Sequence, residues 1–335
     1  MKFGETFTEY LQGEQGLGNC SHVEYKRLKK VLKRCRACQA SVPSPDDDGH
    51  PPNPSSDDLS HHDPCSCQTC TLCDEKFFTE LMKEASDIAW CFNSRVRRLL
   101  HLHVAKGMQK YVVRVRQCFK DDRQEMVEQG RMLIEYITMN AIAIRKILKK
   151  YDKVHSSENG KNFRLKMRAE HMELLQSPWL IELGAFCLNF SGLGGEGGEL
   201  AGYFSLDMPD DQPVMTLTIP SCMKLEYNLT CAICLDTLFN PYALSCGHLF
   251  CKMCACSAAS VMGFQALKSA DPDVKCPVCR EAGVYANSVH MLELNLLLKR
   301  RCKDYWKERI VAERAELVKQ SKEYWDSQAQ LAVGI

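Results

Sequence analysis

The chain has 335 residues, of which 45% are apolar and 25% charged, and its formal net charge is +1. This length suits two or more domains, and the composition is ordinary for a globular protein. The N-terminal sequence MKFGETFTEYLQ has no apolar signal-peptide core. The longest near-apolar stretch, residues 178–193, is too short for a membrane helix and carries Glu182. We therefore expect an intracellular protein without a membrane span.

Helical periodicity dominates the N-terminal half. The predicted helical segments are a hairpin at 1–38, then 74–119, 122–153 and 161–176. A flexible loop is predicted at 41–73, because its first part is rich in Pro, Ser and Asp. Together these helices predict one bundle over residues 1–180.

Two of these helices carry lysines at positions i, i+3, i+4 and i+7, which places each set on one helix face. The sets are Lys26, Lys29, Lys30 and Lys33, and Lys146, Lys149, Lys150 and Lys153. A charge run is most often a solvated surface. Several ammonium groups on one face also suit a compact polyanion. A nucleic-acid track is less favoured, because neither set has interleaved aromatic residues for stacking on bases.

Three parts follow the bundle. Residues 181–221 predict a linker, Gly-rich at 191–202, with a short strand at 213–220. A compact cysteine-rich unit is expected at 222–285. Residues 286–335 predict a long amphipathic helical extension, whose heptad register slips. This extension could form a homodimer, pack on the bundle or grip a substrate.

Twenty cysteines in a reducing compartment favour metal binding over disulfides. Eight candidate ligands follow the spacing C-x2-C, C-x-H-x2-C-x2-C and C-x2-C, namely Cys231, Cys234, Cys246, His248, Cys251, Cys254, Cys276 and Cys279. Eight such ligands predict two tetrahedral zinc ions. No ligand position is left for water, so both ions would be structural. The count of ligands alone leaves their pairing open.

This spacing resembles a RING finger. The resemblance implies a cross-brace, in which Cys231, Cys234, Cys251 and Cys254 hold one ion, and Cys246, His248, Cys276 and Cys279 hold the other. It also implies a ubiquitin ligase that orients a ubiquitin-charged conjugating enzyme and forms no covalent intermediate itself. By motif position, Ile233 and Pro277 would contact the conjugating enzyme, and Arg280 would bridge it to ubiquitin. An exposed arginine and two packing residues are the structural alternative. Many RING fingers have a Trp before the seventh ligand; here Phe264 would stand in for it.

The segments MKFGETFTEYL, EYKRLKKVLK and IRKILKKYDK resemble an SPX domain. SPX domains are helical and bind inositol polyphosphates and pyrophosphates through lysines. By motif position, Lys26 and Lys150 match the main phosphate-binding lysines. The surrounding positions are Lys146, Lys149 and Lys153, with Lys29 and Lys30 as supporting donors and Lys2 near the site. His22 replaces the usual Tyr, and its imidazole can also donate to phosphate.

The whole chain resembles the plant SPX-RING ubiquitin ligases of the nitrogen limitation adaptation type. That resemblance implies phosphate or nitrate transporters as substrates, and gating by inositol pyrophosphates in phosphate and nitrogen homeostasis. It places the protein in the cytoplasm, at the cytosolic side of the plasma membrane and in the nucleus. The expected fold is mostly α: an N-terminal helical bundle, a small zinc-bound α+β RING finger and a long C-terminal helix. The alternative function is a zinc docking module without ligase activity, joined to a basic domain that binds nucleic acid or an anion.

A second cysteine cluster is less specific. Cys65, Cys67, Cys70 and Cys73 lie within nine residues. Four thiols could bind one zinc ion, but free thiols in a flexible segment are the favoured interpretation. Cys256 lies outside the eight-ligand pattern and is expected to be a buried or free thiol.

Overall fold

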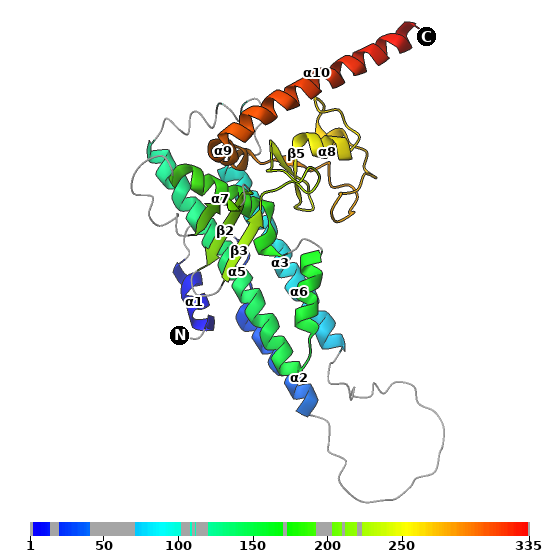
Figure 1. Cartoon of the computed structure of the whole chain (residues 1–335). Coiled ribbons are helices and arrows are strands. Elements are labelled where there is room, and N and C mark those ends of the chain that lie inside the picture. Colours follow the sequence, from blue (N-terminus) through cyan, green and yellow to red (C-terminus); the bar gives the residue numbers. More distant parts are fainter. Residues whose placement is uncertain are drawn as a thin grey trace, which may run out of the picture. The chain divides into compact units, whose positions relative to one another are not determined.

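A computed structural model shows how the chain is arranged (Figure 1), and it describes residues 3–13, 20–40, 71–101, 108, 111, 120–169, 173–191, 203–209, 212–219 and 223–333. Lys2, Cys65, Cys67 and Cys70 lie outside these residues, as do the side chains of Lys33 and Cys73. The chain divides into two compact units. The N-terminal unit comprises Met1–Cys91 and Met139–Leu174, and the C-terminal unit comprises Phe92–Thr138 and Leu175–Ile335.

The N-terminal unit is helical. It contains α1 (Phe3–Gly13), α2 (Tyr25–Ala40), most of α3 (Thr71–Leu99), the second part of α5 (Lys120–His155) and α6 (Asn159–Ala169), and the short 3-10 helix η1 (Leu174–Gln176) begins at its boundary. The helical pattern predicted over 74–119 is interrupted, because α3 ends at Leu99 and His101 has a φ of 54°; of residues 102–119 the structure describes only Met108 and Tyr111, and both are helical. A left-handed residue at that point ends the helix.

An aromatic core holds α3 and α5 together in the N-terminal unit. The ring of Tyr151 stacks on that of Phe77 at a centroid distance of 4.9 Å, and both side chains are buried. The hydroxyl of Tyr151 donates a hydrogen bond to Asp74. Leu28 and Leu32 of α2 are also fully buried, so the apolar face opposite the lysines is a core face.

In the C-terminal unit, helix α7 (Pro178–Ser191) packs against an antiparallel sheet. The sheet has the order β1 (Phe204–Asp207), β2 (Val214–Ile219) and β3 (Met223–Asn228). A Cβ at Gly184 would lie 2.7 Å from the Phe204 ring, so this close packing requires glycine. The predicted strand at 213–220 is the central strand of this sheet. The predicted linker therefore begins inside α7, and its glycine-rich part at 192–202 lies outside the described residues.

The zinc-finger segment follows with a second small sheet of order β5–β4–β6. Its elements are β4 (Pro241–Ala243), β5 (Leu249–Cys251), α8 (Lys252–Ala258), the 3-10 helix η4 (Leu267–Ser269) and β6 (Val289–His290). Within the described residues no helix is long and apolar enough to cross a membrane. The predicted fold class, mostly helical with a small α+β zinc finger and a long C-terminal helix, is confirmed.

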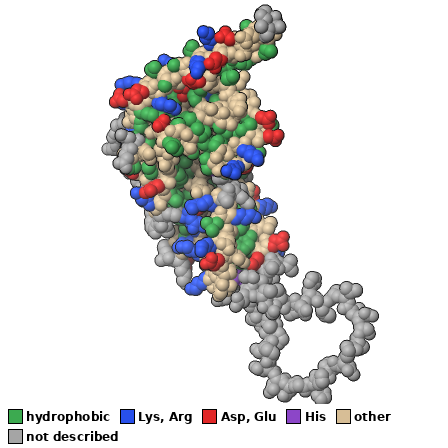
Figure 2. All heavy atoms as spheres, turned by 45° about the vertical axis from the view of Figure 1, so that its right-hand side comes forward, with side chains coloured by type: hydrophobic (Ala, Val, Ile, Leu, Met, Phe, Trp, Pro, Cys, Tyr) green, Lys and Arg blue, Asp and Glu red, His purple; other side chains and the backbone are tan. Residues whose placement is uncertain are grey.

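Two helices form the C-terminal extension. α9 (Leu292–Arg301) ends at Cys302, where φ is −111° and ψ is 58°, and α10 (Lys303–Val333) follows. Apolar side chains alternate with charged ones along α10 (Figure 2), which lies at the top of that view. The exposed apolar residues Val311, Val318 and Trp325 recur every seven residues. The extension therefore has an apolar stripe that faces solvent.

A buried carboxylate joins α7 to α9. Glu182 accepts the backbone N–H groups of Glu293 and Leu294 at 2.7 and 3.1 Å, and so caps the first turn of α9 from another helix. Burial, and then the neighbouring Glu293 carboxylate, raise the pKa of Glu182 to about 8. Asn189 donates to the side chain of Glu293 at 3.1 Å. This network fixes where α9 begins.

Candidate zinc centres and docking face

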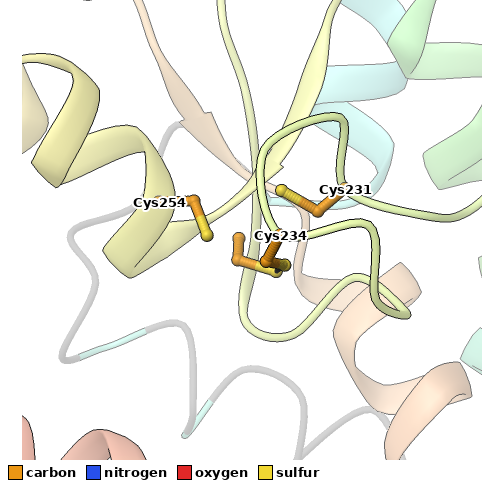
Figure 3. A group of neighbouring side chains, drawn as sticks. Cys231, Cys234 and Cys254 are labelled. Atoms are coloured by element: carbon orange, nitrogen blue, oxygen red, sulfur yellow. Dashed lines mark hydrogen bonds between the residues drawn. The ribbon is translucent and has the colours of Figure 1, made fainter.

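The first cysteine group comes from two separate parts of the fold. Cys231 and Cys234 lie in a turn before β4, Cys251 ends β5, and Cys254 lies on α8. Figure 3 shows Cys231, Cys234 and Cys254 directed toward one another. Their sulfur atoms and that of Cys251 all lie within 4.8 Å of one another. The Sγ atoms of Cys234 and Cys251 are 3.8 Å apart.

The second group contains the histidine. Cys246, His248, Cys276 and Cys279 also bring their ligand atoms within 4.8 Å of one another. The Nδ1 atom of His248 lies 3.4 Å from the Cys246 sulfur and 3.6 Å from the Cys276 sulfur. Nδ1 is therefore the histidine nitrogen that faces the centre. The two groups of four ligands are therefore the same as those that the RING resemblance implied.

The donor atoms fit zinc. A tetrahedron with Zn–S bonds of about 2.3 Å has edges of about 3.8 Å, as between Cys234 and Cys251, and the shorter Zn–N bond reduces the S–N edge to about 3.6 Å. Burial raises the pKa of the Cys246 and Cys276 thiols. A bound cation would favour the thiolate form of these sulfurs and so offset the effect of burial. Two zinc ions would then cross-link a small segment whose own core includes Leu238, Phe250 and Leu267.

Both outer C-x2-C turns have the same backbone design. The N–H of Leu235 donates to the carbonyl of Cys231 at 2.8 Å, and the N–H of Arg280 donates to that of Cys276 at 2.9 Å. Leu235 and Arg280 both have a φ of 62°, where most turns use glycine. Leu235 and Arg280 each directly follow a ligand cysteine, and both keep a side chain although their backbone conformation favours glycine.

The predicted docking residues lie on these two turns. Ile233 is 40% exposed, and Pro277 and Arg280 are exposed as well. Leu235 and Val278 lie beside the predicted docking residues, were not predicted themselves, and are 73% and 48% exposed. Both are apolar residues adjacent to a ligand cysteine, which is a signal that the sequence does carry. Phe264 is 44% exposed.

The lysine sets lie on the outer faces of α2 and α5 in the N-terminal unit. The exposed members are Lys26, Lys29, Lys30, Lys146, Lys149 and Lys153, and Lys150 is half-buried. The side-chain oxygen of Asn140 on α5 accepts the N–H of Val23 at 2.9 Å, just before α2 begins. The ring centroids of Phe3 and Tyr25 are 5.5 Å apart, and the Nζ atom of Lys146 lies 5.4 Å from the centroid of the Phe3 ring. The starts of α1 and α2 thus meet α5 beside the second lysine set.

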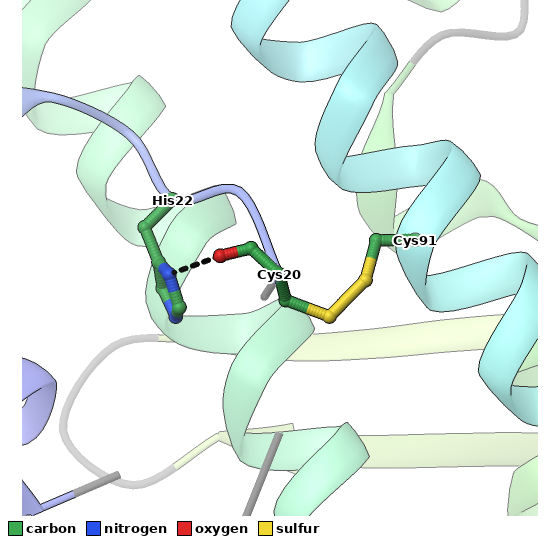
Figure 4. Close-up of a disulfide and its surroundings, with 3 residues drawn as sticks. All are labelled: Cys20, His22 and Cys91. Atoms are coloured by element: carbon green, nitrogen blue, oxygen red, sulfur yellow. Dashed lines mark hydrogen bonds between the residues drawn. A yellow bond between two sulfur atoms is a disulfide. The ribbon is translucent and has the colours of Figure 1, made fainter. Parts of the chain in front are cut away.

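His22 lies in the segment that leads into α2 (Figure 4). Its Nδ1 donates to the carbonyl of Cys20 at 3.1 Å, and Cys20 is joined to Cys91 of α3 by a disulfide. The expectation that the cysteines form no disulfides is wrong for this pair. The two Cα atoms lie 6.0 Å apart although 71 residues separate them, and such proximity has no sign in the sequence. Cys256, in contrast, is a buried cysteine as expected.

Comparisons with known proteins agree with this geometry. The profile of the RING-type zinc-finger family matches residues 231–277. Over the full length of both chains, this protein is 61% identical to the probable E3 ubiquitin-protein ligase BAH1-like of Arabidopsis thaliana. It is likewise 60% identical to the probable E3 ubiquitin-protein ligase BAH1-like 1 of Oryza sativa subsp. indica, and 44% identical to the E3 ubiquitin-protein ligase NLA of Arabidopsis thaliana. No solved structure matches the chain. The chain belongs to the BAH1-like and NLA family of RING-type E3 ubiquitin-protein ligases.

Proposed function

We propose that this ligase is gated by an inositol polyphosphate or pyrophosphate bound at the lysine face of α2 and α5. We also propose that it modifies membrane transporters for phosphate or nitrate. A RING-type ligase works with a conjugating enzyme and a protein substrate, so a ligand could act on either encounter. The single observation that carries the proposal is the pair of lysine sets, one on each of two helices of the same unit.

The chemistry of the lysine face suits a compact polyanion. A lysine ammonium group is a point-charge donor to phosphate, and several on one face repel one another until an anion neutralises them. Arg27, between the lysines on α2, is instead engaged by Glu84 at 2.9 Å. The carboxylate therefore holds an arginine and leaves the lysine set to face outward.

For ubiquitin transfer, we propose that Ile233 and Pro277 dock the conjugating enzyme and that Arg280 donates to the enzyme and to ubiquitin at once. Two exposed apolar residues, each on a turn next to ligand cysteines, support docking, because each turn would be held rigid by its own zinc ion. The guanidinium has five N–H donors in a fixed plane, which suits a bridge between two partners. This is catalysis by orientation and needs no nucleophile.

The substrate class and the site of action rest on the resemblance of the whole sequence to nitrogen limitation adaptation type ligases. We place the protein in the cytoplasm and nucleus and at the cytosolic face of the plasma membrane, where transporter loops are accessible. A homodimer through α10 is part of the proposal, supported by the seven-residue repeat of Val311, Val318 and Trp325.

A binding titration tests the gate. Inositol hexakisphosphate is titrated by calorimetry into the full chain, into Lys150→Ala and into Lys307→Ala, whose lysine is an exposed one on α10. Loss of one charged phosphate contact should raise Kd about tenfold in Lys150→Ala, and Lys307→Ala should bind like wild type. Autoubiquitination with and without an inositol pyrophosphate then gives the sign of the effect. Equal binding by all three proteins, or tighter binding of RNA at equal salt, would contradict the proposal.

A further inference from the structure

Helix α10 lies against the zinc-finger segment along one face. The residues of this face are spaced by three or four, and we call them the α10 seam: Trp306, Arg309, Glu313, Leu317, Gln320 and Tyr324. At the first end, the rings of Trp306 and Phe239 lie 4.3 Å apart and both side chains are buried. Tyr305, next to this face, donates from its hydroxyl to the carbonyl of Thr237 at 2.6 Å. This end of the seam is ordinary core packing.

The other end of the seam contacts the loop around Gly263. The N–H of Gly263 donates to Oε1 of Gln320 at 3.0 Å, and the carbonyl of Gly263 accepts from the ammonium group of Lys252 at 2.5 Å. A Cβ at Gly263 would lie 2.5 Å from the Met253 sulfur and 2.8 Å from a methyl carbon of Leu317. A side chain there would displace Met253 of α8 and Leu317 of α10, so the backbone of Gly263 is packed closely between these two helices.

The next residue is the one that faces outward. Phe264 is 44% exposed, and its ring meets that of Tyr324 edge to face at a centroid distance of 5.7 Å. Tyr324 in turn contacts Trp325 at 5.3 Å. An edge-to-face ring pair is a directional contact, so Tyr324 restricts the orientation of Phe264 as well as covering part of it.

We propose that Gln320 and Tyr324 are positioning residues for the conjugating enzyme. They hold the loop Met262–Phe264 so that Phe264 adds a third apolar contact to the docking face of Ile233 and Pro277. This inference rests on the proposed docking face. It adds that α10, which follows the zinc ligands in the chain, helps to hold that face in place. A zinc-loaded segment that lacks the last turns of α10 would dock the conjugating enzyme more weakly.

Ubiquitin discharge from a charged conjugating enzyme tests this in the full chain. The variants are Tyr324→Ala, Gln320→Ala, Phe264→Ala, the double variant Phe264→Ala with Tyr324→Ala, and Tyr324→Phe. Leu331→Ala is the matched control, because Leu331 is an exposed apolar residue of the same helix that lies outside both the seam and the seven-residue repeat. Tyr324→Ala should raise KM for the conjugating enzyme about three- to tenfold, with kcat and zinc content unchanged. Gln320→Ala should raise this KM by a smaller factor. Tyr324→Phe should keep the wild-type KM, because the ring contact does not need the hydroxyl.

The double variant separates positioning from general stability. If Tyr324 acts through Phe264, the double variant should have the same KM as Phe264→Ala alone. Additive effects, an unchanged KM in Tyr324→Ala, or a fall in zinc content would each overturn the inference. Ile233→Ala distinguishes the two levels of the argument. If Ile233→Ala and Phe264→Ala both leave KM unchanged, the docking face itself is wrong. If both raise KM and Tyr324→Ala does not, only the positioning role of the seam is wrong.

Discussion

The two groups of zinc ligands and the lysine sets of α2 and α5 both bring ionisable side chains together, but they do so in opposite ways. Four of the eight zinc ligands are buried cysteines, and all the ligand atoms in each group converge within 4.8 Å. The lysines are mostly exposed on the outer faces of two helices. The zinc groups are part of the fold's interior, whereas the lysine face lies on a core formed by other residues.

This difference has a physical cause. Thiolates in a buried group need a cation to exist, so folding and zinc binding are one process there. Leu28, Leu32 and Tyr151 supply the core beneath the lysines, so that unit folds whether or not an anion is bound. Removal of zinc should therefore unfold the zinc-finger segment, whereas removal of a lysine should change only the affinity for an anion.

The largest effect is expected from the loss of a zinc ligand. Cys276→Ala should bind one zinc ion fewer and lose all ubiquitin transfer, because both the second tetrad and the turn that carries Pro277 and Arg280 depend on it. Metal analysis and autoubiquitination measure this, with Cys256→Ala, a buried cysteine outside the tetrads, as the matched control. Retention of full transfer by Cys276→Ala would refute the structural role of the ion. Binding of hexakisphosphate should be unchanged.

A change on the docking face should be smaller, because it leaves the metal in place. Ile233→Ala should lower the rate of ubiquitin transfer about 30-fold, the usual cost of about 2 kcal/mol for a central interface residue. Zinc content and thermal stability should stay at the wild-type level, since the side chain is 40% exposed. A fall in zinc content together with the rate would mean that Ile233 packs the turn rather than docks a partner.

Salt sharpens the comparison further. An increase from 50 to 200 mM salt should weaken hexakisphosphate binding roughly tenfold, because charges on the exposed lysines are screened. The zinc content should not change over the same range, because the ligand bonds are buried and short. Calorimetry and metal analysis on the same samples test both statements. Binding that is indifferent to salt would place the anion somewhere other than the lysine face.

The smallest effect concerns the buried Glu182. Its pKa is raised from 4.5 to about 8, so the folded state holds this proton more tightly than the unfolded state. Its contribution to the free energy of unfolding is therefore present below about pH 4.5 and is lost as pH rises toward 8. Glu182→Gln should therefore lose less stability than wild type between pH 5 and pH 8, because an amide does not titrate. Urea unfolding of both proteins measures this, and the titration of the zinc ligands cancels in the difference. Parallel pH profiles would contradict the raised pKa.

Local patterns made some features predictable. Helix periodicity indicated α2 and α5, and cysteine spacing indicated the eight zinc ligands, because each pattern depends on neighbours only a few residues apart; the grouping of the ligands into two sets came from the RING resemblance. The end of α3 was missed because a left-handed residue at His101 has no composition signal. Strands β1 and β3 were missed because their partner, β2, defines them.

The sequence by itself determined the zinc ligands, the two lysine faces and the family of RING-type ligases. Only the tertiary structure decided that Asn140 caps the entry to α2, that Glu182 caps α9, and that Gln320 clasps Gly263. These pairs lie 117, 111 and 57 residues apart in the chain. A hydrogen bond between such residues depends on the packing of whole helices, and no spacing rule records it.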